Sequence, residues 1–488
     1  MADEDKMLSF GIDAKNGRPL KDLTDIDFAE MLGVARKPPG DLNKALKARA
    51  EAEEERVEGG GRAFGVAPDE AGSSPNNLER AGWGILYGPT VDKKIKEALE
   101  PLIAHRRQEK AKPFVIYDED GLLPGEDVYA WLKRRKVRLD QVEPDDGVPY
   151  YLMIVASPQD ISFEFQYTLD LYWACGRLWF DSPEDFARYA KSVVKYETAK
   201  KVPTSRQIAV FAPEHDFDDA TQLFTRKVAE PLCGRPDGKP LGQGLKYKLQ
   251  EFLGKNATKK SLATIMKGGV EGGTPALLFS GGHGMQFPNG DALQFAAQGA
   301  LVCQDWEGYG EITADHWFAA KDVPDDAKVH GMIHFMFACH GGGVPQFDDF
   351  DRLNNQPAEI APQAFFSRLP QALLAHKNGG ALAVLAHMER AWAYSFQGDG
   401  GTPQNQGFLG VLRQLLRGDR IGHATDAFNV NWAATATRLS DEQLKLSKQA
   451  NKDQSLKLVR KLWIQRDDAR NFMVFGDPAV RLREPDLK

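Results

Sequence analysis

Short apolar runs alternate with longer amphipathic segments along most of the chain. Four of these runs contain hardly any polar residue: VPYYLMIVAS (148–157), PALLFS (275–280), GMIHFMFA (331–338) and GGALAVLAH (379–387). Runs of this kind are typical of strands that are covered on both faces, as the strands of parallel sheets are. Residues 182–196 predict a helix between two such strands, with Ser182 as its N-cap.

The same alternation of apolar runs and amphipathic segments continues over the rest of the chain. Further strands are expected in KPFVIYDED (112–120), RQIAVFAP (206–213) and KYKLQEFL (246–253). Further helices are expected at 92–106, with a kink or break at Pro101, at 362–376 and at 441–463. Strands that alternate with helices predict an α/β sandwich built on a mostly parallel sheet.

Composition divides the chain into three regions. Residues 1–80 are expected to be an appendage, with a charged helix at 42–57 followed by a Gly-, Ser- and Pro-rich linker at 58–78. Residues 81–205 would form a first α/β subdomain, and residues 206–488 a second that carries the candidate chemistry. No short internal repeat is visible, which argues against a solenoid.

Charge and composition exclude several classes of function. The chain has 488 residues with a formal net charge of -7, and it contains no long basic tract, so a nucleic-acid partner is not expected. Its first residues lack the pattern of a secretory signal, and its apolar runs are too short to span a bilayer, so we expect a cytoplasmic protein without membrane association. Four cysteines without a CxxC pair predict neither a disulfide framework nor a zinc ribbon.

Two apolar runs end in glycine-rich turns that carry a reactive residue type. The first reads LLFSGGHGM and contains His283, and the second reads FMFACHGGG and contains Cys339. The carboxyl ends of neighbouring parallel strands open on one crevice, where ligands bind, so both side chains should meet there. Glycine lets the backbone turn sharply and lets a substrate approach closely.

A thiol beside an imidazole suits nucleophilic catalysis without a cofactor. His283 could take the proton of Cys339 and later protonate the leaving amine. The backbone N–H groups of Gly284 and Cys339 are the candidates for stabilising the oxyanion.

The order and spacing of the two residues resemble those of the caspase-like cysteine peptidases. His283 precedes Cys339 by 56 residues, close to the offset of roughly 50 in caspases with their Q-A-C-x-G motif. Here the motif reads F-A-C-H-G, without the leading glutamine. Within this superfamily the chain is most similar to the gingipain-like and CHAT-domain branches, because the segments ACGRLWFDSPEDFARYAKSVVKYE and FGDPAVRLR resemble gingipain-like stretches.

The resemblance covers about residues 82–484 and implies a three-layer caspase-hemoglobinase type sandwich of two adjacent α/β subdomains. It also implies a cysteine endopeptidase that acts on protein substrates, with a role in bacterial defence or signalling by analogy with CHAT-type proteases. The linker at 58–78 is a candidate for autoprocessing, and a regulatory partner is expected. The alternatives are a non-catalytic caspase-like scaffold and another thiol hydrolase, either an amidase or an acyltransferase.

Other histidines and cysteines have simpler interpretations. His340 directly follows the nucleophile, so its side chain should point to the opposite side, which favours His283 as the base. His334 should pack against the sheet. A zinc site made of His283, His340 and His387 lacks a recognisable ligand spacing. The cysteines at 175, 233 and 303 are expected to be inert thiols.

Charged residues after the nucleophile suggest a substrate preference. Asp348, Asp349 and Asp351 lie in GGGVPQFDDFDRL and would suit a basic residue before the cut. Arg390, which follows the next strand, would instead suit an acidic residue. An ordinary acidic loop or a calcium-binding loop explains the aspartates equally well, so the preference for a basic residue is slight.

Overall fold

The computed structural model describes residues 8–20, 75–139, 142–308, 310–353, 356–397, 406–448 and 453–488. The predicted helix at 42–57 and most of the predicted linker lie outside these residues. All structural statements below concern the described residues.

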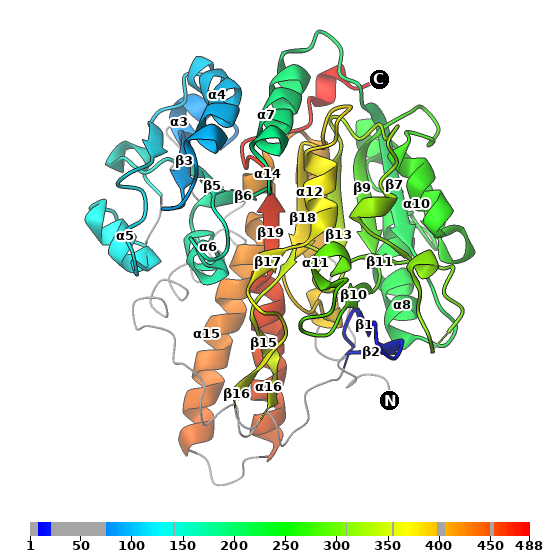
Figure 1. Ribbon diagram of the computed structural model, residues 1–488. Helices are drawn as coiled ribbons and strands as arrows, with labels where there is room; N and C mark the ends of the chain where they lie inside the picture. The colour runs from blue at the N-terminus through cyan, green and yellow to red at the C-terminus, as the bar shows by residue number, and fades with distance from the viewer. Residues whose placement is uncertain are drawn as a thin grey trace.

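A ten-stranded sheet runs through the whole molecule (Figure 1), in the order β4-β3-β5-β6-β19-β18-β13-β9-β7-β8. Its first half comprises β3 (Trp83–Tyr87), β4 (Phe114–Tyr117), β5 (Tyr151–Val155) and β6 (Ala174–Leu178). Its second half comprises β7 (Ser205–Ala212), β8 (Lys248–Leu253), β9 (Pro275–Gly281), β13 (Ile333–Phe337) and β18 (Ala383–His387). The strands within each half are parallel.

The last strand, β19 (Phe472–Phe475), joins the two halves. It runs parallel to β6 and antiparallel to β18, so the two halves of the sheet point in opposite directions. The carboxyl ends of β9, β13 and β18 therefore meet at one edge, away from the carboxyl ends of the first half. The mixed α/β fold with a large, mostly parallel sheet confirms the expected fold class.

Helices cover the sheet on its two faces (Figure 1). The helices before β9 are α3 (Leu78–Ala81), α4 (Lys93–Gln108), α5 (Val128–Arg134), α6 (Phe163–Leu169), α7 (Pro183–Thr198), α8 (Asp219–Phe224), α9 (Glu230–Leu232) and α10 (Lys259–Met266). Those after it are α11 (Gln294–Ala297), α12 (Arg368–Leu374), α13 (Gln406–Leu416), α14 (Ile421–Ala424), α15 (Asp426–Lys448) and α16 (Asp453–Arg470). The long α15 and α16 lie side by side and extend from the sheet.

Most expected elements are present, with three differences. The helical stretch predicted at 441–463 is divided between two helices, α15 and α16, which lie side by side. Ser182 caps α7 as predicted, because its side chain accepts a hydrogen bond from the Asp185 amide. Helix α4 continues through Pro101, so of the predicted kink or break there the break is wrong and the kink stays a prediction. The helix predicted at 362–376 is shorter, because Phe365–Phe366 form strand β17, which pairs with β14 (Gly343–Val344).

A second, smaller sheet contains the amino-terminal segment. Its order is β12-β11-β10-β1-β2, with β1 (Gly11–Asp13), β2 (Arg18–Pro19), β10 (Gly284–Gln286), β11 (Leu301–Val302) and β12 (Trp317–Phe318). Phe10, just before β1, is completely buried in the main core. Residues 8–20 are therefore not part of an appendage, in contrast to the sequence-based expectation. The boundaries at 80 and 205 stay predictions.

Asp477 follows β19 in the FGDP segment and binds elements of the first half. Its carboxylate accepts hydrogen bonds from Trp83 Nε1 at 3.0 Å and from Arg106 Nε at 2.7 Å. Its amide donates to the Tyr189 hydroxyl at 2.6 Å. Asp477 and Arg106 are both fully buried. Through this ion pair and its other two hydrogen bonds, Asp477 links α4, β3 and α7 to the strand that joins the two halves.

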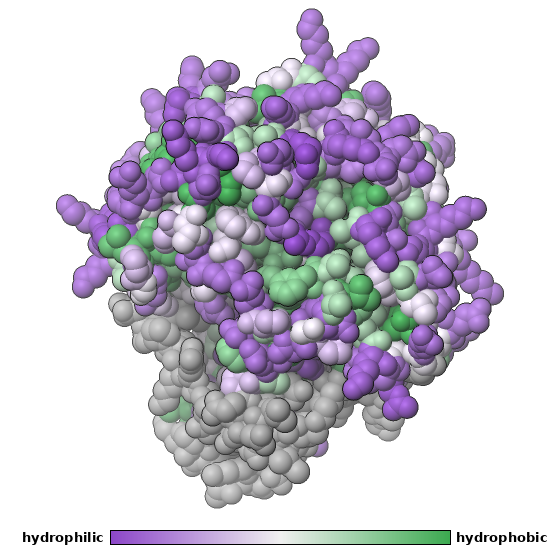
Figure 2. All heavy atoms as spheres, viewed as in Figure 1, coloured by the Kyte–Doolittle hydropathy of each residue, from purple (hydrophilic) through white to green (hydrophobic). Residues whose placement is uncertain are grey.

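The visible surface is mainly polar. Figure 2 shows hydrophilic residues over most of this face, with small hydrophobic patches between them. Among the described residues, no helix is both long enough and apolar enough to cross a membrane.

Replacing Asp477 tests whether this ion pair holds the two halves together. Asp477→Ala leaves the buried Arg106 without one of its counter-charges, so the free energy of unfolding should fall by about 3–5 kcal/mol. Urea unfolding followed by circular dichroism measures the change. Asp325→Ala is the control, because Asp325 forms an exposed ion pair with Lys377 and its removal should leave the stability nearly unchanged. Equal effects of the two substitutions would contradict the assigned role.

Candidate active site

His283 and Cys339 lie at the carboxyl ends of two adjacent strands. Strands β9 and β13 are parallel neighbours, with Gly281 opposite Phe337, and each reactive residue comes two positions after its strand ends. The Gly282 amide extends the pairing by donating to the Phe337 carbonyl at 3.1 Å. Both reactive side chains are buried. The structure thus brings the two predicted residues to one edge of the sheet.

His283 forms a buried hydrogen bond with an aspartate that the sequence analysis did not identify. Its Nε2 lies 2.8 Å from Oδ2 of Asp218, the residue that caps α8 by accepting the Thr221 amide at 3.0 Å. Burial by itself would raise the pKa of Asp218. The neighbouring His283 and the hydrogen bonds that the Asp218 carboxylate accepts outweigh this effect and lower the pKa well below its usual value. Asp218 is therefore charged at neutral pH. A proton on Nε2 leaves the other ring nitrogen as an acceptor.

The second ring nitrogen of His283 is available for proton transfer. Nδ1 is buried and has no hydrogen-bond partner among the described residues. Asp218 orients the ring from the opposite side, as a carboxylate does in hydrolase triads. The acidic turn after the strand at 205–212 was the available sequence signal, but acidic turns at helix starts are common.

Two backbone amides converge on one oxygen next to the thiol. The N–H groups of Gly284 and Cys339 donate to the Phe10 carbonyl oxygen at 2.9 and 3.0 Å. A Cβ atom on Gly284 would lie 2.0 Å from the Cys339 carbonyl oxygen, so only glycine fits there. These are the two amides that the sequence analysis selected for the oxyanion.

Residues 8–10 of the chain itself lie in this cleft as an extended peptide. The Phe10 amide donates to the Ala391 carbonyl at 2.8 Å, and the Ala393 amide donates to the Leu8 carbonyl at 2.9 Å. Ser9 and Trp392 form an antiparallel bridge between these two bonds. Residues 8–10 thus pair with residues 391–393 as an added β-strand, which is one common mode of peptide recognition.

The peptide continues past the thiol. A Cβ atom on Gly11 would lie 3.0 Å from Cys339 Sγ, and β1 then pairs with β10, with Gly11 opposite Gly284. The peptide therefore runs through the cleft, with the Phe10 carbonyl at the two amides and Gly11 beside the sulfur. Sequence analysis missed this segment, because three extended residues have no distinctive pattern.

The thiol of Cys339 is neutral in this arrangement. Burial raises its pKa to about 12, although the Ala391 amide and Arg390 act in the opposite direction. The Ala391 amide donates to Sγ at 3.1 Å. A thiol with such a pKa is a poor nucleophile at neutral pH, so Cys339 is unreactive while the cleft is closed.

The other histidines are bonded elsewhere. Nε2 of His334 lies 2.8 Å from the Ser280 hydroxyl, within the sheet as predicted. Nε2 of His340 lies 3.1 Å from Oε1 of Gln286, and the backbone of His340 has a left-handed φ of 56°. His387 contacts the carbonyl oxygens of Glu389 and Asp468. Among the described residues, none of the three histidines considered for zinc belongs to a group of side chains that could hold a metal ion together.

The charged residues considered for substrate selection form ion pairs within the protein. Arg390 donates to Asp348 at 2.5 Å, and both side chains are almost fully buried. Asp349 forms an ion pair with Arg470. Asp351 lies on β15 (Phe347–Leu353), which pairs with β16 (Gln356–Glu359). This pairing gives no support to the expected preference for a basic residue, which stays a prediction.

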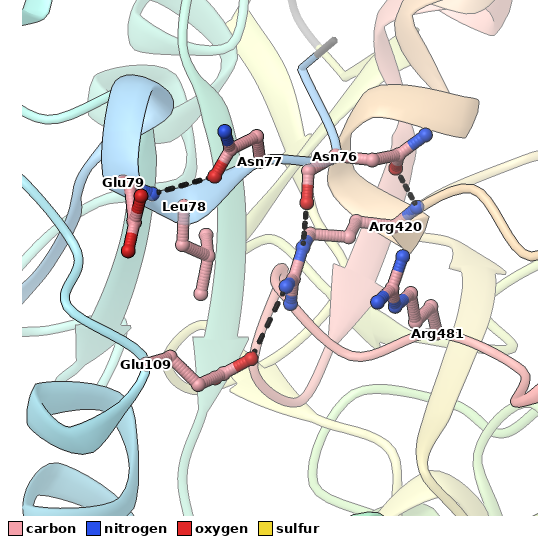
Figure 3. A pocket seen from close by; sticks show the side chains of 7 residues that line it. All are labelled: Asn76, Asn77, Leu78, Glu79, Glu109, Arg420 and Arg481. Atoms are coloured by element: carbon pink, nitrogen blue, oxygen red, sulfur yellow. Dashed lines mark hydrogen bonds and ion pairs between the residues drawn. The ribbon is translucent and has the colours of Figure 1, made fainter.

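An open surface pocket shares no residue with this cleft. It is lined by Asn76, Asn77, Leu78, Glu79, Glu109, Arg420 and Arg481 (Figure 3). Within it Arg420 donates to the Asn76 carbonyl at 3.0 Å and to Glu109 at 3.2 Å, as the dashed lines show. The pocket is therefore a place where residues 75–79 are held against the carboxyl-terminal part.

Comparison with known proteins gives a family and several similar solved structures, two of which are described here. The family model of peptidase family C25 matches residues 122–483. A solved structure described as a protease has 13% identity and a TM-score of 0.48, covering 82% of this chain and 78% of that chain. A complex of the pro- and mature domains of RgpB from Porphyromonas gingivalis has 13% identity and a TM-score of 0.41, covering 83% of this chain and 80% of that chain. No curated protein matches the chain.

The pH dependence of thiol alkylation tests whether Cys339 is closed off. With a pKa raised to about 12, its reaction with iodoacetamide should accelerate about tenfold per pH unit between about pH 7 and pH 10. Because the pKa of Cys339 is raised, the closed state keeps this thiol protonated, whereas the thiol of an unfolded chain ionises near about pH 8.5. The closed state therefore loses stability as the pH rises above about 8.5. Mass spectrometry of the Cys339 peptide measures the rate.

A Phe10→Glu variant is the control for this measurement. It replaces the ring that anchors the segment with a charge, so Cys339 should react faster and its rate should level off at lower pH. A plateau below about pH 9 in the unaltered chain would contradict the closed arrangement.

Proposed function

The chain belongs to peptidase family C25, which makes it a cysteine endopeptidase, and on that premise we propose that Cys339 is its nucleophile. His283 is the general base and acid, and Asp218 orients His283 and stabilises its charged form. The amides of Gly284 and Cys339 stabilise the oxyanion. This assignment extends the predicted His–Cys pair to a triad.

Acylation starts when His283 accepts the thiol proton of Cys339. The thiolate attacks the carbonyl carbon of the residue before the cut, a C–S bond forms, and the carbonyl oxygen takes the negative charge. The two amides that now hold the Phe10 oxygen are placed to hold this charge. His283 then protonates the leaving nitrogen, the C–N bond breaks, and a thioester remains on Cys339.

In deacylation a water molecule replaces the thiol as the nucleophile. His283 takes a proton from a water molecule, which attacks the thioester carbonyl at the same oxyanion position. The C–S bond breaks, His283 returns its proton to the thiolate, and the new carboxylic acid leaves and loses its own proton to solvent. Throughout both steps Asp218 stays ionised and stabilises the charged imidazole.

One observation carries the proposal. A peptide carbonyl lies 2.9 and 3.0 Å from two backbone amides, one of which belongs to the reactive cysteine itself. This is the distance range that an oxyanion site requires. A non-catalytic scaffold would not need such a geometry. The same geometry suits an amidase or acyltransferase less well, because the cleft holds an extended peptide on both sides of the thiol.

The proposal extends to the biological setting. The substrates are proteins, as expected for a peptidase family. The cleft holds a segment of its own chain, which supports control by displacement or cleavage of residues 8–20, whereas most of the predicted autoprocessing linker at 58–78 lies outside the described residues. A role in defence or signalling and a cytoplasmic location are proposals from the sequence alone.

Removal of the nucleophile should abolish turnover. In the Phe10→Glu chain, where the cleft is opened, Cys339→Ala should reduce peptide cleavage by at least about 10⁴-fold, because no other group can form the thioester. Cys233→Ala, at a half-buried thiol outside the cleft, should leave the rate within twofold. Cleavage products are followed by mass spectrometry, and equal losses in both variants would refute the assignment.

Asp218→Asn tests the third member of the triad. The amide can still cap α8, but it cannot stabilise a charged His283, so kcat should fall by about 10²- to 10⁴-fold with little change in KM. Steady-state kinetics with one peptide substrate gives both constants. Thermal unfolding is the control for a structural effect, and Asp219→Asn is the matched neighbour variant. An unchanged kcat would remove Asp218 from the mechanism.

A further inference from the structure

We propose that the cleft selects a large aromatic side chain, above all phenylalanine, at the residue whose carbonyl group is attacked. The inference rests on the proposed function, because it concerns the specificity of the same site. It differs from the slight preference for a basic residue that the sequence suggested. The chain's own segment at residues 8–11 shows how such a side chain is held.

Phe10 occupies the position directly before the scissile bond. Its carbonyl oxygen accepts the Gly284 and Cys339 amides, and its own amide donates to Ala391. The residue that places its carbonyl at the oxyanion site is by definition the one before the cut. In this register Leu8 and Ser9 precede it, and Gly11 follows the bond.

The pocket around the Phe10 ring is built from phenylalanines. The ring centroid lies 5.0 Å from that of Phe337 and 5.8 Å from those of Phe224 and Phe396, all in edge-to-face orientation. The ring of His283 lies at 5.9 Å. Edge-to-face packing between aromatic rings is favourable beyond the burial of their area. Phe10 is 0% exposed, so the pocket encloses the whole ring.

The walls of this pocket are held by the strands that carry the reactive residues. Phe337 comes two positions before Cys339 and occupies the place of the glutamine in the Q-A-C-x-G motif. Phe224 stacks on Phe337 at 5.5 Å with an interplanar angle of 6°. A Cβ atom on Gly281 would lie 2.0 Å from the Phe224 ring, so the glycine allows this ring to approach the sheet.

A charged side chain would be poorly accommodated in this pocket. A guanidinium or carboxylate there would lose its water against aromatic rings. The nearby Arg390 and Asp348 are directed at one another, and Asp349 at Arg470. Their charges are therefore compensated inside the protein, which leaves shape and aromatic packing as the basis of selection.

A protection series in the full-length chain tests the pocket without requiring turnover. Alkylation of Cys339 by iodoacetamide is compared in the unaltered chain and in Phe10→Tyr, Phe10→Leu, Phe10→Arg and Phe10→Glu. Protection should be strong with phenylalanine and tyrosine, intermediate with leucine, and at least about 100-fold weaker with arginine or glutamate. Equal or better protection by arginine would overturn the proposal, as would full protection by glutamate.

Peptide cleavage tests the same preference during catalysis. The full-length Phe10→Glu chain is given Leu-Ser-Xaa-Gly peptides that differ only at Xaa, with phenylalanine, arginine, lysine, aspartate or alanine. The value of kcat/KM should be highest for phenylalanine and at least about 100-fold lower for the three charged residues. A Cys339-dependent preference for arginine, lysine or aspartate would refute the aromatic pocket while leaving the peptidase assignment intact.

Substitutions in the pocket wall distinguish a change in substrate specificity from a general loss of activity. Phe396→Ala enlarges the pocket, so the ratio of kcat/KM for tryptophan over phenylalanine should rise about tenfold. Phe295→Ala is the control, because Phe295 is exposed and packs on Phe365; it should leave the ratio unchanged. If no peptide is cleaved and no Phe10 variant changes alkylation of Cys339, both the proposed function and the aromatic pocket fail.

Discussion

Two buried backbone amides impose the constraint on which the cleft depends. The N–H groups of Gly284 and Cys339 point to one place at the edge of the sheet, and a buried donor without an acceptor costs about 1–3 kcal/mol. The Phe10 carbonyl satisfies both donors. In the proposed mechanism a substrate supplies the same oxygen, and it competes with a segment of the same chain, whose effective concentration is high. The geometry that favours catalysis therefore also favours occupation by the segment.

The sequence predicted the parts of the site that have a local pattern. An apolar strand that runs into a glycine-rich turn is recognisable in one stretch of sequence, and it identified His283, Cys339 and Gly284. The structure places all three at one edge because their strands are neighbours. The strand pattern also predicted the α/β class, since strands buried on both faces require helical layers on each side.

The missed parts depend on contacts between distant positions. Asp218 precedes its partner His283 by 65 residues and resembles an ordinary helix cap. Residues 8–10 pair with residues 391–393, and no local pattern indicates such a pairing. Phe337, Phe224 and Phe396 each look like core residues in the sequence. Only their common neighbour, Phe10, reveals them as a pocket.

The order of elements along the chain governs when the two halves of the sheet can join. Strand β19 lies between these halves, yet it follows every other strand of the sheet in the sequence. Residues 8–20 precede all of these strands, and domains fold largely as their residues are synthesised. The segment beside Cys339 is therefore already present when β19 joins the two halves, so the site is assembled around a segment that occupies it.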